Sequence, residues 1–482
     1  MISFGTSGWR GIIAEDFTFA TVRAVARAIA DHLLSPESRV AGAGSPDPRP
    51  VVVVGYDTRF QSEAFAAECA KVLCAAGVRC RLAERPTPTP VLAHAVRALG
   101  ATGAVNITAS HNPPEWNGLK FSGASGGPAR PAATDAIAGR ANQILAGPDA
   151  ATIPVLDPAE ARARGLLAPL DPAPAYLDQV RRLVNLAAIR SAGLRVAADL
   201  LHGTAGGYLD ALLREAGCDL EVLHADRNPG FGGHPPEPAA AHLGALARRV
   251  TEGRRHLGLA CDGDADRFGI LDGDGTFIEP NIILALVAAH LLATRDWPGG
   301  LARSVATTHL LDRVAALHGR AVHETPVGFK YIGELIARDA IVLGGEESAG
   351  LSVRGHVPEK DGILACLLVA ELVAAGGRRM LQDLLRDLYA RVGTVLTRRV
   401  NVPLDAGRRE AFQARLGNLP PRIAGRAIVG SNRTDGVKLL LEEDCWILVR
   451  PSGTEPMARL YIEAASEAAL EDLEAAGRAL FL

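Results

Sequence analysis

Short apolar runs alternate with amphipathic segments along much of this chain. Val51–Val54 is a run of β-branched residues that predicts a buried strand, and Ser62–Ala76 has the spacing of an amphipathic helix. Gly103–Ile107, Leu194–Ala198 and Leu257–Cys261 predict further strands. Strands that alternate with helices indicate an α/β core, in which ligands gather beyond the carboxyl ends of the strands.

Breaks in this pattern divide the chain into four units. The length of 482 residues indicates three or four domains. The Ala-, Pro- and Gly-rich stretch Gly123–Pro174 contains the first boundary, and the last unit has the pattern strand, helix, strand, strand, helix. We expect α/β domains at residues 1–172, 173–269 and 270–392, and a C-terminal α+β domain at 393–482.

Composition excludes several classes of protein. The formal charge is −3, and the chain has neither the basic surplus typical of nucleic-acid-binding proteins nor an acidic tail. The seven cysteines include no Cys-x-x-Cys pair, which favours reduced thiols and the cytoplasm. No signal peptide is evident, and the apolar stretch Ile282–Ala293 is too short to span a bilayer. We expect no nucleic-acid or membrane partner, and a monomer or a dimer.

Lysine is rare in this chain, which makes each lysine informative. Only five of the 51 basic residues are lysines, namely Lys71, Lys120, Lys330, Lys360 and Lys438. In a chain so rich in arginine, a retained lysine marks a place where a compact, titratable ammonium is needed.

The segment Thr108–Pro113, Thr-Ala-Ser-His-Asn-Pro, follows a predicted strand. Ser110 there could be a nucleophile, a capping residue or an ordinary loop residue. A serine hydrolase is disfavoured because the chain has no Gly-x-Ser-x-Gly elbow. His111 could orient the serine hydroxyl or a phosphate oxygen, or serve only as a structural histidine.

Three aspartates alternate with small residues after Cys261. Asp262, Asp264 and Asp266 would converge in extended or turn backbone, and they would repel one another without a cation. Oxygen ligands favour Mg²⁺. A calcium loop does not fit, because Arg267 and Gly273 stand where glycine and glutamate are needed. A solvated acidic loop is the alternative.

Two further segments offer groups suited to a sugar phosphate. Glu346 and Ser348 in Gly-Glu-Glu-Ser suit sugar hydroxyls, although helix capping would also explain them. Arg450, followed by Pro-Ser-Gly-Thr, could bind phosphate through its guanidinium and through an anion nest. No Walker A or Gly-x-Gly-x-x-Gly motif supports the use of ATP or NAD.

At these four segments, and essentially end to end, the chain resembles the α-D-phosphohexomutase superfamily, which includes phosphoglucomutase and phosphomannomutase. The resemblance implies three similar α/β domains with mixed sheets and a smaller α+β C-terminal domain around a central cleft. It also implies Mg²⁺ as cofactor and a hexose 1,6-bisphosphate as activator.

The resemblance also implies roles for individual residues. Ser110 matches the phosphoserine whose phosphate helps the three aspartates to bind Mg²⁺, and Arg267 supports this group. Lys120, Arg10 and His111 match the groups around the transferring phosphoryl, with Lys120 as general acid/base. The implied substrate contacts are Glu346, Ser348, Lys330, His356, Lys360, Arg450, Ser452, Gly453, Thr454 and Arg459.

The implied reaction moves phosphate reversibly between C1 and C6 of a hexose. Some dual-specificity relatives have histidines where this chain has Ala349-Gly350 and Phe329, so glucose is our first choice of sugar. A dual glucose/mannose enzyme and a phosphoglucosamine mutase are the alternatives. A sugar-phosphate phosphatase and a non-catalytic sugar-phosphate binder are the rival classes.

Overall fold

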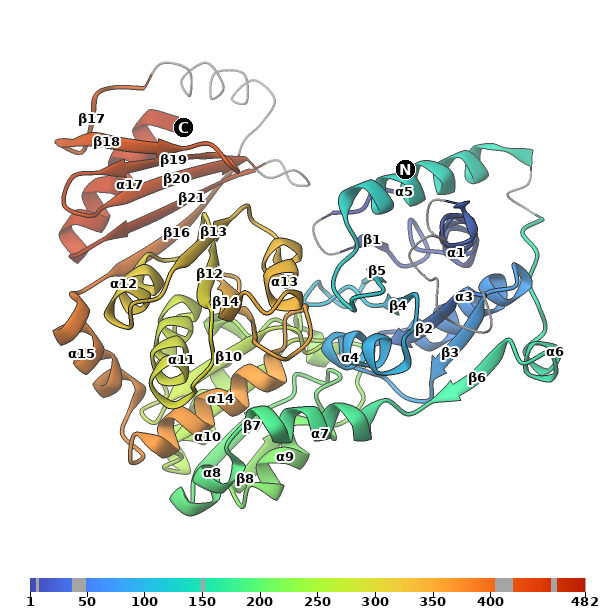
Figure 1. Cartoon of the computed structure of the whole chain (residues 1–482), viewed down its shortest axis with the longest axis horizontal. Coiled ribbons are helices and arrows are strands. Elements are labelled where there is room, and N and C mark those ends of the chain that lie inside the picture. Colours follow the sequence, from blue (N-terminus) through green and yellow to red (C-terminus); the bar gives the residue numbers. More distant parts are fainter. Residues whose placement is uncertain (6–7, 37–48, 149–151, 404–418, 452–456, 482) are drawn as a thin grey trace.

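The computed structural model describes residues 1–5, 8–36, 49–148, 152–403, 419–451 and 457–481, and these form four sheets with their helices. In Figure 1 the N-terminal unit (blue) lies at the right and the C-terminal sheet (red) at the upper left, with the second and third units between them.

The first sheet has helices on both faces. Its order is β1 (Trp9–Ile12), β5 (Trp116–Gly123), β4 (Gly103–Ile107), β2 (Val51–Tyr56), β3 (Arg79–Ala83) and β6 (Leu167–Leu170), and its helices are α1 (Phe19–Leu34), α3 (Ser62–Ala75), α4 (Thr89–Leu99), α5 (Pro131–Ala146) and α6 (Pro158–Ala163). Val52 and Val54 pack into the core that contains α1 and α3, whereas Val53 packs with α4. Burial on both faces explains the uninterrupted apolar run.

The second sheet carries the aspartate turn. Its order is β11 (Phe277–Ile278), β10 (Phe268–Asp272), β9 (Leu257–Cys261), β7 (Arg195–Asp199) and β8 (Asp219–Leu223), with helices α7 (Ala173–Leu183), α8 (Leu186–Ala192), α9 (Leu209–Glu215) and α10 (Gly244–Glu252). Because β10 pairs antiparallel with β9, this sheet extends past the boundary that we expected at residue 269.

The third sheet shares a core with the second. Its order is β13 (Val322–Thr325), β12 (Gly300–Ser304), β14 (Ile341–Glu346) and β15 (Gly350–Val353), with helices α11 (Pro280–Thr294), α12 (Leu310–Leu317), α13 (Phe329–Ala337), α14 (Gly362–Ala375) and α15 (Leu381–Val392). Helix α14 is buried on nearly every side and joins residues of both units in one hydrophobic cluster. A helix that is apolar all round requires such surroundings.

The C-terminal sheet is antiparallel throughout. Its order is β16 (Leu396–Pro403), β21 (Met457–Ala464), β20 (Trp446–Pro451), β19 (Val437–Leu441), β18 (Arg426–Asn432) and β17 (Arg422–Ile423), and α17 (Glu467–Phe481) covers one face. On the other face, Trp446, Leu448 and Tyr461 pack against Val305 and Ala306 of the third unit.

The expected fold class is confirmed, with three mixed α/β sheets and an antiparallel C-terminal sheet. The last unit has more strands than the pattern predicted, and the helix predicted after β16 lies outside the described residues. The four domain ranges otherwise remain predictions. Within the described part of the chain, no helix is long and apolar enough to cross a membrane.

Candidate active site

Ser110 lies just beyond β4, and only 2% of its surface is exposed. Its φ of 53° is in the left-handed region, which is uncommon for residues other than glycine and is often found at active sites. Its Oγ donates a hydrogen bond to Oδ2 of Asp262 at 2.7 Å and lies 3.3 Å from Nδ1 of His111. The serine segment therefore meets the aspartate segment, 152 residues away in the chain.

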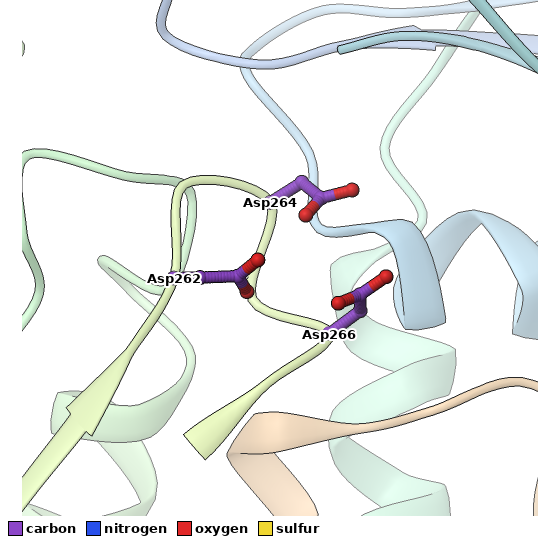
Figure 2. Close-up of side chains that lie close together, drawn as sticks. All are labelled: Asp262, Asp264 and Asp266. Atoms are coloured by element: carbon purple, nitrogen blue, oxygen red, sulfur yellow. The ribbon is translucent and has the colours of Figure 1, made fainter. Parts of the chain in front are cut away.

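The three aspartates occupy the turn between β9 and β10, and Figure 2 shows their carboxylates turned toward a common space. All three are buried, and their candidate ligand atoms lie within 4.8 Å of one another. Within the described residues, Oδ1 of Asp264 and Oδ1 of Asp266 have no hydrogen-bond partner. Buried carboxylates are costly without a compensating charge, so this donor set fits a hard divalent cation such as Mg²⁺.

Gly263 allows the aspartate turn to approach the serine segment closely. A Cβ at this position would lie 2.6 Å from the carbonyl oxygen of Ser110, so a larger residue would push the two segments apart. On the other side of the turn, the amide N–H of Thr89 donates to the carbonyl oxygen of Asp264 at 2.9 Å. Gly263 thus serves the contact between the first two units.

Two lysines balance part of the carboxylate charge. Nζ of Lys120 lies 2.6 Å from Oδ2 of Asp264 and 2.8 Å from Oδ2 of Asp266, and Nζ of Lys360 lies 2.8 Å from the same Asp266 oxygen. Burial opposes the ionised form of Asp266, but the two ammonium groups hold its pKa well below the usual range. Burial and the other two aspartates raise the pKa of Asp262. Burial also opposes the charged form of Lys120, but the carboxylates raise its pKa, so it is an ammonium at neutral pH.

Cations also gather on the serine side. A guanidinium nitrogen of Arg10 donates a hydrogen bond to Oδ1 of Asn112, two residues after the serine. Burial, together with the nearby Arg267, lowers the pKa of Arg10 to about 10. Burial and the same two guanidinium groups hold the pKa of His111 well below its usual range, so its ring is neutral. Converging positive charge beside a serine hydroxyl suits a phosphoryl group.

Arg59 fixes the shape of the serine segment, and the sequence did not single it out. Its buried guanidinium donates to the carbonyl oxygens of Ser110 at 2.7 Å, Asn112 at 2.6 Å, Pro113 at 2.7 Å and Trp116 at 3.0 Å. Asp57 pairs with it at 3.1 Å. The only available signal was the pair Asp57-x-Arg59 directly after a buried strand.

The predicted sugar segment lies in the third sheet, at the turn between β14 and β15. Glu346 ends β14, and its Oε1 accepts a hydrogen bond from the amide N–H of Gly328 at 2.7 Å. Burial, together with the neighbouring Glu347, raises the pKa of Glu346 to about 7. Ser348 lies in the turn that follows, and Lys330 is the second residue of α13, directly after the Gly328 loop. Both side chains are half-buried.

The segment around Lys360 supports the aspartates from the third unit. Nε2 of His356 lies 2.7 Å from Oδ2 of Asp361, and His356 is only 1% exposed, so its ring lies in the core. Glu359, which the sequence did not indicate, is also buried and accepts a hydrogen bond from the amide N–H of Lys360 at 2.9 Å. The pKa of Glu359 is raised to about 7, and burial is the main cause.

The predicted phosphate site lies on the C-terminal sheet. Arg450 of β20 and Arg459 of β21 are direct cross-strand partners. Like charges in this arrangement repel, so the pair suits an anion. Although burial acts against it, the carboxylate of Asp435 raises the pKa of Arg450. Ser452, Gly453 and Thr454 lie outside the described residues.

A cavity of about 430 Å³ lies beside the sugar segment, and residues of the second and third units and of the C-terminal sheet line it. Its lining includes Arg267, Ser348, Arg399 and Tyr461, but neither Ser110 nor the three aspartates. The cavity therefore does not mark the reacting centre, which the contacts between serine and aspartates define. It extends the site from the sugar segment toward the C-terminal sheet.

Four sequence-family profiles match the chain in the order in which these units occur. They are the phosphoglucomutase/phosphomannomutase α/β/α domain I at residues 1–147, domain II at 174–275, domain III at 279–392 and the C-terminal domain at 400–479. The chain belongs to the phosphoglucomutase/phosphomannomutase family.

Individual relatives match over nearly the whole chain. A phosphoglucomutase/phosphomannomutase of Thermococcus kodakarensis is 31% identical over 96% of this chain and 95% of its own length. A phosphoglucosamine mutase of Frankia alni is 33% identical over 97% and 95%. A crystal structure from Thermus thermophilus, described as a phosphomannomutase, is 34% identical with a TM-score of 0.81 and covers 99% of this chain and 98% of that one.

Family membership makes the chain a phosphohexomutase, which is an isomerase-type phosphotransferase. The relatives carry names that refer to different sugars. The family thus fixes the type of reaction and leaves the sugar open.

Proposed function

We propose that this family member interconverts hexose 1-phosphate and hexose 6-phosphate, with glucose as the preferred sugar, through phospho-Ser110. The observation that carries the proposal is the 2.7 Å contact between Ser110 Oγ and Asp262, inside a buried cluster of three carboxylates and two lysines. A hydroxyl that only capped a loop would not need such surroundings.

In the forward direction, phospho-Ser110 gives its phosphoryl to the free hydroxyl of the bound hexose monophosphate. The bond from phosphorus to Oγ breaks and a bond from phosphorus to the sugar oxygen forms. Lys120 gives its proton to Oγ, which becomes a serine hydroxyl again, and takes up the proton of the sugar hydroxyl. The resulting hexose 1,6-bisphosphate turns end for end and returns its other phosphoryl to Ser110. The same bisphosphate acts as activator, because it phosphorylates an unmodified Ser110.

Charge neutralisation is the main task of the protein in this step. Lys120 and Arg10 stabilise the negative charge on the transferring phosphoryl, and Lys120, as an ammonium, can also donate a proton. The neutral ring of His111 orients the phosphate oxygens, and Arg267 supports the group. Asp262, Asp264 and Asp266, together with a phosphate oxygen on Ser110, would hold Mg²⁺, which supplies further positive charge.

The remaining predicted residues hold the sugar phosphate. Glu346 and Ser348 hydrogen-bond to sugar hydroxyls, and Lys330 and Lys360 approach the same substrate. Arg450 and Arg459, with Ser452, Gly453 and Thr454, hold the phosphate that does not react. His356 has its Nε2 engaged by Asp361, so we assign it the positioning of the Lys360 segment in place of a direct contact.

The choice of glucose rests on the Glu-Glu-Ser form of the sugar segment and on the Glu-Lys-Asp-Gly segment. Phe329 and Ala349-Gly350 stand where dual-specificity relatives have histidines, which disfavours mannose. Glucosamine is the second candidate, because a phosphoglucosamine mutase is among the relatives that match over nearly the whole chain.

³¹P NMR of the purified protein tests this proposal. With Mg²⁺ and a trace of glucose 1,6-bisphosphate, the protein is offered glucose 1-phosphate, mannose 1-phosphate and glucosamine 1-phosphate in turn. We expect the signal of the 6-phosphate to grow fastest with glucose, without free phosphate. Release of inorganic phosphate would indicate the phosphatase, and faster conversion of another sugar would overturn the choice of glucose. No change with any of the three would favour the non-catalytic binder.

A further inference from the structure

Asp435 joins the C-terminal sheet to the loop that supports the sugar segment. It lies in the turn between β18 and β19, and both of its carboxylate oxygens are engaged. Oδ1 accepts a hydrogen bond from Nε of Arg450 at 2.8 Å, within the C-terminal unit. Oδ2 accepts one from the amide N–H of Val327 at 3.1 Å, in the third unit.

The contact at Val327 continues to the sugar carboxylate. The next residue, Gly328, donates its amide N–H to Oε1 of Glu346 at 2.7 Å. Helix α13 begins directly afterwards and carries Lys330. Three hydrogen bonds and one peptide unit therefore connect the guanidinium of Arg450 with the carboxylate of Glu346.

The turn that carries Asp435 is built to a fixed shape. Oδ1 of Asn432 accepts a hydrogen bond from the amide N–H of Thr434 at 2.7 Å, which closes the turn on the side before the aspartate. After it, Gly436 has a φ of 84°, and a Cβ there would lie 2.5 Å from the carbonyl oxygen of Val449. Only glycine suits this conformation and this contact, which hold the turn against the strand of Arg450.

Asp435 supplies the negative charge that Arg450 needs beside a second arginine. Arg450 faces Arg459 across the sheet, and its side chain is only 15% exposed. The carboxylate of Asp435, 23% exposed, provides a charge-assisted hydrogen bond that aims the guanidinium. Because it uses Nε, this bond does not occupy the terminal nitrogens of Arg450.

We propose that Asp435 is a positioning residue that couples the arginine for the distant phosphate to the carboxylate that recognises the sugar. This inference rests on the proposed function, which assigns those roles to Arg450 and Glu346. Asp435 aligns the C-terminal sheet with the Gly328 loop, so that phosphate binding at Arg450 and sugar binding at Glu346 reinforce each other.

The test is Asp435→Asn, which keeps the size of the side chain and removes its charge. We expect KM for glucose 1-phosphate to rise about tenfold, with kcat reduced much less, because a charge-assisted bond that serves binding is lost. Asp435→Glu should recover part of the loss. The matched control is Asp444→Asn, since Asp444 also belongs to the C-terminal unit and pairs with Arg313 of the third unit at 3.4 Å, but is 87% exposed. Its KM should stay within about twofold of wild type.

A double-mutant cycle separates positioning from a general structural effect. In an Arg450→Met background, Asp435→Asn should raise KM less than about twofold further, because its main partner is already gone. An equal rise in both backgrounds, or a KM for Asp435→Asn within about twofold of wild type, would overturn the proposal. Thermal unfolding of each variant checks that the fold is retained.

Calorimetric binding of glucose 6-phosphate distinguishes this proposal from the proposed function. If the wild-type protein neither binds nor converts any hexose phosphate, the function and this inference fall together. If the wild-type protein binds and converts the sugar phosphate and Asp435→Asn does so equally well, only the coupling is overturned.

Discussion

The junction between the first two units and the junction between the third unit and the C-terminal sheet each enclose a buried lysine, in opposite surroundings. Lys120 lies among the carboxylates of Asp264 and Asp266. Nζ of Lys438 lies 2.9 Å from the carbonyl oxygen of Val305, 2.7 Å from Nε2 of His309 and 4.1 Å from the ring centroid of Trp446.

This difference in surroundings sets the pH at which each lysine loses its charge. The carboxylates raise the pKa of Lys120 despite its burial. Burial, with Arg303 nearby, lowers the pKa of Lys438 to about 8, and Glu324 at 3.3 Å only partly opposes the change. The first junction therefore holds a fixed positive charge among buried carboxylates. The second holds a lysine whose charged form is disfavoured by burial, so that it loses its charge a little above neutral pH.

The largest effect on turnover should come from removal of the Ser110 hydroxyl at the first junction. Ser110→Ala should lower turnover by at least about 10³-fold, because no phosphoryl carrier remains. Glucose 6-phosphate should still bind, as calorimetry would detect. Ser352→Ala is the matched control, since Ser352 is also buried and donates to the carbonyl oxygen of Val357 at 2.6 Å, away from the reacting groups. Near-normal turnover of Ser110→Ala would refute the phosphoserine role.

Replacing a carboxylate of the first junction should change the Mg²⁺ dependence of activity. Replacing an aspartate of the other alternating pair should not. Asp264→Asn should raise the Mg²⁺ concentration for half-maximal activity about tenfold or more, because one hard oxygen ligand is weakened. The control is Asp274→Asn, in the turn between β10 and β11, where the carboxylate accepts hydrogen bonds from the amide N–H of Thr276 and from the side chain of Gln382. An unchanged metal titration of Asp264→Asn would argue against the aspartate turn as the metal site.

Glu346 lies at the end of β14 in the third unit, and its substitution should change the preference for the sugar and not the response to the metal. Glu346→Gln removes the charge that sugar hydroxyls would meet, so the ratio of rates with glucose 1-phosphate and mannose 1-phosphate should change by about tenfold. The Mg²⁺ titration of the same variant is the internal control and should not move. An unaltered sugar ratio would remove Glu346 from the recognition of the sugar.

The elements that position the first junction were predictable, because their signals are local. Gly103–Ile107 and Leu257–Cys261 are strands with the expected bounds, since each is a short, mainly apolar run that ends at polar residues. The contact between Ser110 and Asp262 joins residues that are far apart in the chain. Only the resemblance to a family implied it. The role of Arg59 was missed because its guanidinium binds four backbone carbonyl oxygens. Such contacts do not depend on the side chains of the residues that are bound, so they produce no recognisable residue pattern in the sequence.

The second junction was less predictable for the same reason. Strand β18, Arg426–Asn432, is half exposed and interrupted by Gly430, so its alternation is weak. Asp435 has two partners, one of them 108 residues away. The scarcity of lysine did not identify the second junction. Lys71 and Lys438 both lie outside the four chemical segments, but Lys438 is 1% exposed and Lys71 is 33% exposed.

The smallest effect on turnover should come from Lys438→Met, which tests through the pH dependence of stability whether Lys438 loses its charge a little above neutral pH. The pKa of Lys438 falls from 10.5 to about 8 on burial. Between these values the unfolded chain binds more protons than the folded one, so the lysine makes the folded state more stable as pH rises. Thermal or urea unfolding should therefore show the stability of wild type relative to Lys438→Met rising by about 2 kcal/mol from about pH 7.5 to about pH 9.5, while turnover falls less than about threefold.

Lys71→Met is the control for this measurement, because Lys71 is 33% exposed and pairs with Glu68 at 3.0 Å within the first unit. Its stability difference from wild type should not change over the same pH range. A constant difference for Lys438→Met would mean that Lys438 remains charged, as Lys120 does. The two junctions would then not differ in the way their contacts indicate, and the docking of the C-terminal sheet would depend on charge as well.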